Sequence, residues 1–237
     1  MTVQNMTEQA RISCGIPKKI AMINDIAGYG RCSTTVSLPI ISAMGVQVCP
    51  VPTSVFSNHT GFPVHFMHDC TPILPQYLEK WQELELTFDG IVSGFLGSEA
   101  QIEIVMDVIR QFGQEDTKVI IDPIMGDHGE TYATYTPAMC SRMKELVSMG
   151  DIVTPNLTEA CILTGRTYRK DGWSRKELGQ LAGEIQAMGP ECVIITGVNQ
   201  GGYIMNVVAE GERTAFPRTR RVGHERPGTG DVFSSVV

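Results

Sequence analysis

The sequence predicts a single α/β domain built on a mostly parallel central sheet, and three observations lead to this fold class. Short apolar runs rich in β-branched residues alternate with longer segments whose apolar residues recur every three or four positions, as in successive strand–helix–strand units. Most of the short runs are apolar throughout, as strands covered by helices on both faces must be. The 237 residues, 42% of them hydrophobic, are enough to bury a sizeable core.

The expected strands each end at a Gly, Asp or Thr, residues that favour turns or strand ends. In chain order they are Lys19–Asp25, Gln47–Thr53, Asp89–Gly94, Lys118–Asp122, Asp151–Thr154 and Cys192–Thr196. Because each buried strand must be covered, helices are expected between them, which makes the sheet the middle layer of a three-layer αβα sandwich.

The clearest helix prediction is Ser98–Phe112, where Ser98 is a plausible N-cap and one face is apolar. That face carries Ile102, Val105, Met106 and Ile109. After Thr196 the pattern changes: Gly201–Val208 and Arg213–Pro217 resemble two strands joined at Glu210–Gly211, which predicts an antiparallel hairpin near the C-terminal side.

The chain shows no repeat and no linker, so residues 19–237 are expected to form one domain and residues 1–18 a poorly ordered N-terminal extension. At the carboxyl end, Gly228–Asp231 is predicted to open a helix, yet the sequence stops six residues later at Val237. The domain therefore looks truncated there. Either the sequence is a fragment or the protein itself is short, and both alternatives remain open.

Charge and cysteine content narrow the expected partners. With 26 acidic and 19 basic side chains the net charge is -7, which disfavours nucleic acids and anionic membranes and favours small molecules. The 7 cysteines form no CxxC pair, which argues against zinc and suits reduced thiols. The first nineteen residues contain no apolar block, so neither a signal peptide nor a membrane span is expected. A cytoplasmic enzyme is the natural expectation.

The strongest local motif is Gly228-Thr229-Gly230-Asp231. Two glycines let backbone N–H groups approach an anion, and the following helix N-terminus adds partial positive charge, so the loop suits a phosphoryl group. A carboxylate in such a loop repels phosphate unless it takes a proton from an attacking hydroxyl, which makes Asp231 a candidate base. The alternative is that Asp231 merely caps the helix.

A second motif follows the strand Lys118–Asp122. An acidic residue at the carboxyl end of a buried strand lies where open α/β sheets bind ligands, so Asp122 could hold a metal ion or a water beside a triphosphate, with Asp127 in the loop after it. The alternative is an ordinary strand-ending turn.

A third motif, Thr154-Pro155-Asn156 followed by Glu159, leads from another strand end into a helix. Glu159 is expected at the same sheet edge as Asp122, and two carboxylates from neighbouring strand ends suit magnesium. Capping of the helix by Asn156 explains the pattern equally well.

Two glycine-bearing polar loops near the amino end, Asn24–Arg31 and Ser57–Gly61, are candidates for the acceptor pocket. The first contains GxG without the third glycine of a dinucleotide fingerprint. Five arginines between Arg213 and Arg226 either bind ATP phosphates or form a solvated face.

Taken in order, these segments resemble the ribokinase-like (PfkB) superfamily, and most closely the pyridoxal kinases. The likeness runs from about Lys19 to the last residue. It is carried by Asn24–Arg31, Phe56–Gly61, Ser93–Phe95, Ile121–Asp127, Thr154–Asn156 with Glu159, and Gly228–Asp231. The Phe-Ser-Asn-His-Thr segment is the most discriminating, because hydroxymethylpyrimidine kinases share the Gly-Thr-Gly-Asp loop without it.

The resemblance implies transfer of the γ-phosphoryl group of ATP to the 5′-hydroxymethyl group of pyridoxal, pyridoxine or pyridoxamine, with Mg²⁺ as cofactor. Asp231 matches the base, and Gly228, Thr229 and Gly230 match the anion hole. Asp122 and Glu159 match positions near magnesium. The nucleotide site is expected to comprise Asp122, Asp127, Thr154, Asn156, Glu159, Thr196, Arg226 and Pro227. The substrate site is expected to comprise Asp25, Thr60, Gly61, Phe95, Tyr135 and Asp231.

Two residues depart from the pattern: Asp25 stands where many pyridoxal kinases have Ser facing the pyridine ring, and Phe95 where many have Tyr. A carboxylate at position 25 could pair with a protonated ring nitrogen. The alternatives left open are a hydroxymethylpyrimidine or sugar kinase of the same superfamily and a nucleotide- or vitamer-binding protein without turnover. The family pattern and the hairpin edge also suggest a homodimer.

Overall fold

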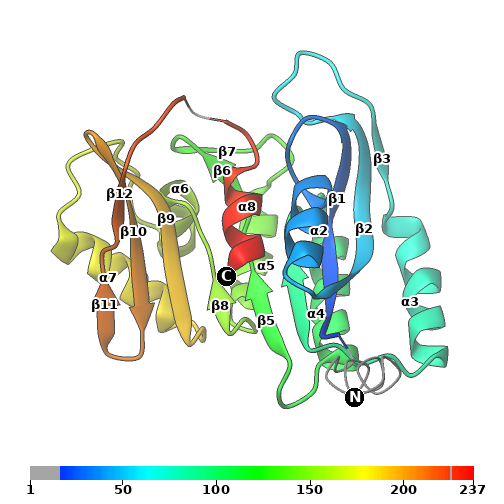
Figure 1. Cartoon of the computed structure of the whole chain (residues 1–237). Coiled ribbons are helices and arrows are strands. Elements are labelled where there is room, and N and C mark those ends of the chain that lie inside the picture. Colours follow the sequence, from blue (N-terminus) through cyan, green and yellow to red (C-terminus); the bar gives the residue numbers. More distant parts are fainter. Residues whose placement is uncertain (1–16, 225) are drawn as a thin grey trace, which may run out of the picture.

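The protein is seen in a computed structural model that describes residues 17–224 and 226–237 (Figure 1). Its main sheet has ten strands in the order β11-β10-β9-β8-β5-β4-β1-β2-β3, with β12 also paired to β10. The strands are β1 (Lys19–Tyr29), β2 (Gln47–Asn58), β3 (Met67–Asp69), β4 (Gly90–Ser93), β5 (Lys118–Ile121), β8 (Ile152–Val153), β9 (Cys192–Gln200), β10 (Tyr203–Glu210), β11 (Arg213–Ala215) and β12 (Arg218–Arg220). A separate hairpin pairs β6 (Gly126–Asp127) with β7 (Glu130–Thr131).

The predicted mostly parallel sheet is confirmed. Strands β2, β1, β4, β5, β8 and β9 are parallel, and the predicted hairpin of β10 and β11 is antiparallel. The structure also pairs β9 with β10 in an antiparallel manner and adds the short edge strand β3 against β2. These two features were absent from the prediction, because β9 continues to Gln200 past the turn-like Thr196-Gly197 and β3 is only three residues long.

Helices cover both faces of the sheet, as Figure 1 shows. Two of them lie on one face: α2 (Thr34–Ala43) and α8 (Thr229–Val236). The other face carries α3 (Leu74–Glu83), α4 (Glu99–Phe112), α5 (Pro137–Val147), α6 (Leu157–Thr164) and α7 (Arg175–Gln186), with the short 3-10 turn Thr71–Ile73 before α3. The large apolar core lies between these five helices and the sheet.

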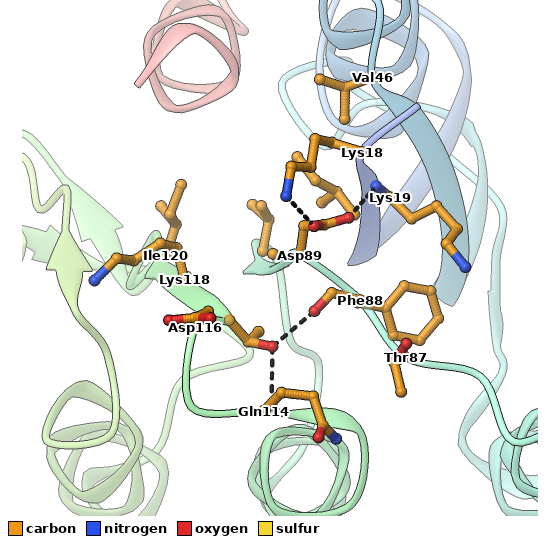
Figure 2. Close-up of a pocket in the computed structure, with 14 residues that line it drawn as sticks. Lys18, Lys19, Val46, Thr87, Phe88, Asp89, Gln114, Asp116, Lys118 and Ile120 are labelled. Carbon is orange, nitrogen blue, oxygen red and sulfur yellow. Dashed lines mark hydrogen bonds and ion pairs between the residues drawn. The ribbon is translucent and has the colours of Figure 1, made fainter. Parts of the chain in front are cut away.

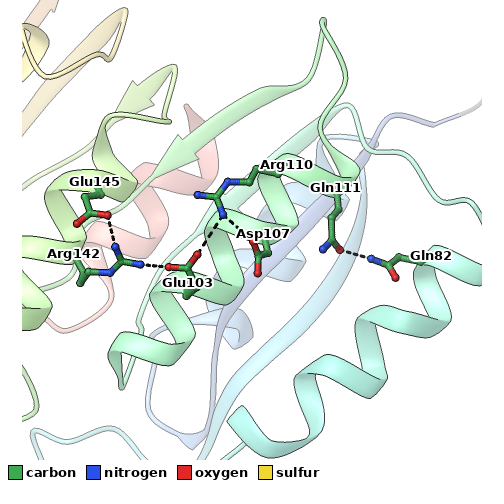
Figure 3. Close-up of polar contacts among 7 residues, drawn as sticks. All are labelled: Gln82, Glu103, Asp107, Arg110, Gln111, Arg142 and Glu145. Carbon is green, nitrogen blue, oxygen red and sulfur yellow. Dashed lines mark hydrogen bonds and ion pairs between the residues drawn. The ribbon is translucent and has the colours of Figure 1, made fainter.

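The best predicted helix shows why the sequence folds this way. Ser98 caps α4 by accepting a hydrogen bond from the Gln101 N–H at 3.3 Å. Its buried face includes Ile102, Val105 and Phe112, so the periodic apolar residues reach the core as predicted. On the solvent side, Figure 3 shows a network of exposed ion pairs in which Arg110 and Arg142 share Glu103, joining α4 to α5. Exposed pairs of this kind contribute about 0–1 kcal/mol each, so packing of the apolar face dominates.

The residues just beyond the strand ends stay in register across one edge of the sheet. The N–H groups of Gly94, Asp122 and Thr154 donate to the carbonyls of Ile23, Ser93 and Ile121 at 2.9, 2.9 and 3.1 Å. The Thr196 N–H continues the series by donating to the Pro155 carbonyl at 2.9 Å. This edge therefore brings together the carboxyl ends of β4, β5 and β8 and the middle of the longer strands β1 and β9, segments that lie far apart in the sequence.

A pocket of about 520 Å³ lies at the opposite, amino ends of β1, β4 and β5 (Figure 2). Apolar Ile20, Val92 and Ile120 line it, and Asp89 at its rim accepts hydrogen bonds from the Lys18 Nζ at 2.6 Å and the Lys19 N–H at 2.8 Å. It shares none of the predicted site residues.

The described part of the chain contains no helix that is both long and apolar enough to span a membrane. The expected N-terminal extension, residues 1–18, lies outside the described residues except for its last two positions.

Candidate active site

The candidate site is centred on the start of α8, which follows the Gly228-Thr229-Gly230-Asp231 motif. Gly228 precedes the helix with φ +79°, and a Cβ there would lie 1.9 Å from the Arg31 carbonyl oxygen. Glycine is therefore required both by the backbone conformation and by the close approach of the Arg31–Ser33 loop. The first turn of a helix leaves N–H groups without intrahelical partners, so this turn presents donors and the positive end of the helix dipole to an anion.

Asp231 lies in that first turn and is half-buried. Burial raises the pKa of Asp231, while hydrogen bonds from the Ser33 backbone N–H and the Asn24 side-chain amide lower it. The helix begins at Thr229 without a side-chain cap, so Asp231 is not the N-cap residue. The Asp231 carboxylate faces Asn24 of β1 and Ser33 in the loop that follows β1.

Asp25 lies beside Asp231 and is 5% exposed. Burial raises its pKa to about 6, the Ser33 hydroxyl opposes this by hydrogen bonding to the carboxylate, and the charge of Asp231 raises the pKa further. The register of β1 against β2 shifts between Asn24 and Ile26. This bulge interrupts the usual alternation of a strand, so that neighbouring residues Asn24 and Asp25 both reach the α8 side of the site.

Asp122 follows β5 directly and is 8% exposed. Burial raises its pKa, and the nearby charge of Asp231 adds to the rise, whereas the hydroxyls of Thr154 and Ser234 lower it. Asp122 and Asp231 are therefore electrostatic neighbours in the structure. Asp122 lies between the carboxylate in α8 and the strand end at Thr154.

Glu159 is 3% exposed in the first turn of α6, and its carboxylate accepts two backbone hydrogen bonds. The donors are the Asn156 N–H at 2.8 Å and the Met125 N–H at 3.2 Å, and Asn156 Oδ1 accepts in turn from the Glu159 N–H at 3.0 Å. The capping interpretation of this motif is thus confirmed as a capping box. Burial and the charge of Asp122 raise the pKa of Glu159, so the two carboxylates are also electrostatic neighbours.

These two carboxylates fit a magnesium ion that is held mainly by substrate. Mg²⁺ is commonly bound by one or two carboxylates together with phosphate oxygens and waters. Among the described residues no group of three or more His, Cys, Asp and Glu is arranged as a protein-only metal centre. Two neighbouring buried carboxylates with raised pKa values would both be better satisfied beside a cation.

The predicted substrate residues lie on the other side of Asp231, after β2 and β4. Thr60 and Gly61 are exposed in the β2–β3 loop, where the Gly61 N–H donates to His59 Nδ1 at 3.1 Å. Phe95 packs edge-on against Phe56, with ring centroids 5.8 Å apart. This side of the site therefore offers an aromatic wall and an exposed polar loop.

The predicted nucleotide residues lie after β5 and β8, within β9 at Thr196, and before α8. Asn156 bridges to Thr196 between the strand ends and donates from Nδ2 to the Gly126 carbonyl at 2.8 Å. Asp127 lies exposed in the β6–β7 hairpin beside His128. Arg226 and Pro227 are exposed in the segment that enters α8.

Tyr135, predicted to lie over the site, is 6% exposed and packs in the apolar core, with no hydrogen-bond partner for its hydroxyl. Tyr132, three residues earlier, is 41% exposed and lies near the charged carboxylates. Burial raises the pKa of Tyr132, and so do the charges of Glu159, Asp127, Asp122 and Asp231. The resemblance points to Tyr135, in Tyr135-Thr136-Pro137, and the sequence alone does not single out Tyr132.

Asn24 and Ser33 are two further residues of the site that sequence reasoning did not single out. Asn24 lies within the first glycine-bearing loop, so its position was available, but its contact with Asp231 depends on the approach of α8. Ser33 has φ +56°, which is unusual for a residue other than glycine, and a backbone angle of this kind leaves no sequence pattern.

Comparisons with known proteins agree with this geometry. The family model for phosphomethylpyrimidine kinase matches residues 38–237. The chain is 39% identical to a Bacteroides thetaiotaomicron protein provisionally assigned as a phosphomethylpyrimidine kinase, with a TM-score of 0.90 over 95% of this chain and 78% of that one. A second crystal form of that protein contains pyridoxal, and the chain matches it with 38% identity and a TM-score of 0.89 over 93% and 79% of the two chains.

Two pyridoxal kinases are also similar to this chain. The structure of the enzyme from Lactobacillus plantarum is 26% identical, with a TM-score of 0.84 over 94% of this chain and 79% of that one. Pyridoxal kinase of Ovis aries is 28% identical over 90% of this chain and 73% of its own length. With the family model matching well over half of the sequence, this chain belongs to the phosphomethylpyrimidine kinase family, a group of ribokinase-like kinases to which it is joined by both sequence and fold.

Proposed function

We propose that this kinase transfers the γ-phosphoryl group of ATP to the 5′-hydroxymethyl group of pyridoxal, pyridoxine or pyridoxamine. The observation that carries the proposal is the position of Asp231, a half-buried carboxylate in the same helical turn that presents backbone donors to an anion. A base at this position lies close to any phosphoryl group that those backbone donors bind. Support for the vitamer comes from the similar Bacteroides protein, which was crystallised with pyridoxal.

In this proposal Asp231 accepts the proton of the substrate hydroxyl as its oxygen attacks the γ-phosphorus. The new oxygen–phosphorus bond forms while the bond from the γ-phosphorus to the bridging oxygen of ADP breaks. The backbone N–H groups of Gly228, Thr229 and Gly230 stabilise the charge on the transferring group. Burial of Asp231 raises its pKa towards the working pH, which suits a general base.

Asp122 and Glu159 would hold Mg²⁺, which neutralises phosphate charge when bound. The nucleotide is assigned to residues that follow β5 and β8, to Thr196 within β9 and to the segment entering α8. These are Asp127, Thr154, Asn156, Thr196, Arg226 and Pro227. Thr154, Asn156 and Thr196 lie on neighbouring strands at one edge of the sheet, as binding of a single extended ligand requires.

The vitamer is assigned to Asp25, Thr60, Gly61 and Phe95, whereas Tyr135, which the resemblance also implies, packs in the apolar core and is left out. Asp25 is the distinctive member, because its pKa of about 6 leaves it mostly ionised at neutral pH in a site that disfavours the charge. A protonated pyridine nitrogen placed against it would offset that cost. We therefore assign Asp25 to the ring nitrogen.

A second candidate substrate is a hydroxymethylpyrimidine, which the name of the matching family model favours. The experiment supplies the purified protein with ATP and Mg²⁺ and, in turn, the three vitamers and 4-amino-5-hydroxymethyl-2-methylpyrimidine. ADP release is measured by a coupled assay and the phosphorylated product by mass spectrometry. We expect the highest kcat/KM with a vitamer. A higher value with the pyrimidine would replace the proposed substrate, and binding of both ligands without ADP release would indicate a binding protein.

We also propose that the protein works in the cytoplasm as a homodimer. The β2–β3 loop supports an association surface, because Val64 and Phe66 in it and Tyr29, whose ring packs on Phe62, are 79%, 64% and 68% exposed. Equilibrium sedimentation at several concentrations would test the dimer.

A further inference from the structure

We infer that Asn24 is a positioning residue for Asp231: backbone donors fix its side-chain oxygen, and its side-chain nitrogen then holds the Asp231 carboxylate in place. The inference rests on the proposed function, in which Asp231 is the base. It adds a residue from the first strand to the machinery of the last helix.

The first step concerns the orientation of the Asn24 amide. Its Oδ1 accepts two hydrogen bonds, from the Asp25 N–H at 2.9 Å and from the Phe95 N–H at 2.9 Å. The side chain is 5% exposed and packs on Gly94, where an added Cβ would lie 2.5 Å from Asn24 Cγ. An amide oxygen that faces two donors must point its NH₂ group the other way. The amide of Asn24 is therefore fixed before any substrate arrives.

The second step concerns what the NH₂ group meets. It hydrogen-bonds to the Asp231 carboxylate, which also receives the Ser33 backbone N–H. Ser33 provides that N–H with φ 56° and ψ -149°, a conformation that is essentially restricted to glycine. A strained residue of this kind persists only where its surroundings specify it. Here the backbone N–H of Ser33 donates a hydrogen bond to Asp231, and the Ser33 hydroxyl donates one to Asp25.

The third step is the consequence for the base. Burial favours the protonated form of Asp231, in which it could not accept a proton, and the two donors favour the ionised form. Loss of the Asn24 donor should therefore make the base harder to ionise and free its carboxylate to rotate. Because Asn24 also joins the end of β1 to Phe95, the test must separate the donor from the acceptor.

The Asn24→Asp substitution makes this separation. An aspartate keeps an oxygen that can accept from the Asp25 and Phe95 N–H groups, but it replaces the donor that faces Asp231 with a second acidic oxygen. The control is Gln111→Glu, which also exchanges an amide for an acid, in an exposed position on α4 where the side chain bonds to Gln82 (Figure 3). Asn24→Ser is a second test variant, without an added charge.

The readouts are the pH dependence of kcat with pyridoxal, urea unfolding, and the ¹³C NMR titration of the Asp231 carboxyl in the ligand-free protein. In both Asn24 variants we expect the acid limb of kcat and the Asp231 titration to move up by about 1–2 pH units, since a hydrogen bond to a charged group has this strength. In the Asn24 variants, the KM for ATP should stay within twofold of that of the unmodified protein. In Gln111→Glu, kcat should stay within twofold of the unmodified protein at every pH.

An Asp231 titration that is the same in both Asn24 variants and the unmodified protein would overturn the inference and leave Asn24 as a structural link. Failure of the proposed function gives a different result. In that case no alcohol is phosphorylated at any pH, while the ligand-free titration of Asp231 still moves in the variants and supports the contact. If Asn24→Asp did not fold, Asn24→Ser alone would decide by the same titration.

Discussion

Replacing Asp25 with Asn should stabilise the ligand-free protein at neutral pH. The carboxyl group has an ordinary pKa of 3.8 and a folded-state pKa of about 6, chiefly because of burial. The difference of about 2 pH units corresponds to up to about 3 kcal/mol, since each unit is about 1.4 kcal/mol. The side chain is only 5% exposed, so solvent screening takes away little of this figure.

The sign follows from proton binding. Between pH 3.8 and about 6 the folded state holds more protons on Asp25 than the unfolded state does, so stability falls as the pH rises through this range. The free-energy cost of ionising Asp25 in the folded protein is fully present above its folded-state pKa and absent below its unfolded-state pKa. Asn is a neutral isostere whose oxygen can still accept from the Ser33 hydroxyl, so it removes the cost without removing that contact.

The assay is urea unfolding of the unmodified protein and Asp25→Asn at several pH values from 4 to 8, without ligand. The gain in unfolding free energy should be near zero at pH 4 and grow to about 1–3 kcal/mol at pH 7.5. Asp116→Asn, at an exposed position, should change stability by less than about 0.5 kcal/mol at every pH. A gain that does not depend on pH, or a loss of stability at pH 7.5, would refute the reasoning.

Three further predictions concern catalysis. Asp231→Asn should keep pyridoxal and ATP binding within a few-fold while kcat falls by about 10²–10⁴, and retention of more than about half of kcat would show that Asp231 is not the base. Asp122→Ala and Glu159→Gln should each raise the Mg²⁺ concentration for half-maximal rate; unchanged titrations in both would remove the magnesium assignment. Gly228→Ala should lower the thermal midpoint and reduce kcat at least tenfold, because its φ is +79° and its Cβ would strike the Arg31 carbonyl; unchanged values of both would contradict the required close approach.

The sequence by itself determined the strand–helix alternation and hence the parallel centre of the sheet. Periodicity and capping are local properties, and segments such as Glu99–Phe112, with its cap at Ser98, carry both within a few residues. The same reasoning placed Asp122 and Thr154 at strand ends, where the structure also has them, whereas Thr196, expected to end its strand, lies within β9. Because parallel strands end at one edge, it could also predict that these residues share that edge.

The tertiary structure decided what a periodic pattern cannot encode. The short strand β3 and the pairing of β9 with β10 depend on contacts between segments, not on their own composition. The same is true of the partners of Asp231. Asn24 lies more than two hundred positions away in the sequence, and it reaches the carboxylate because a bulge turns the end of β1 towards α8. Burial and neighbouring charges where β1 approaches α8 set the protonation of Asp25 and Asp231, and neither property exists until the chain has folded.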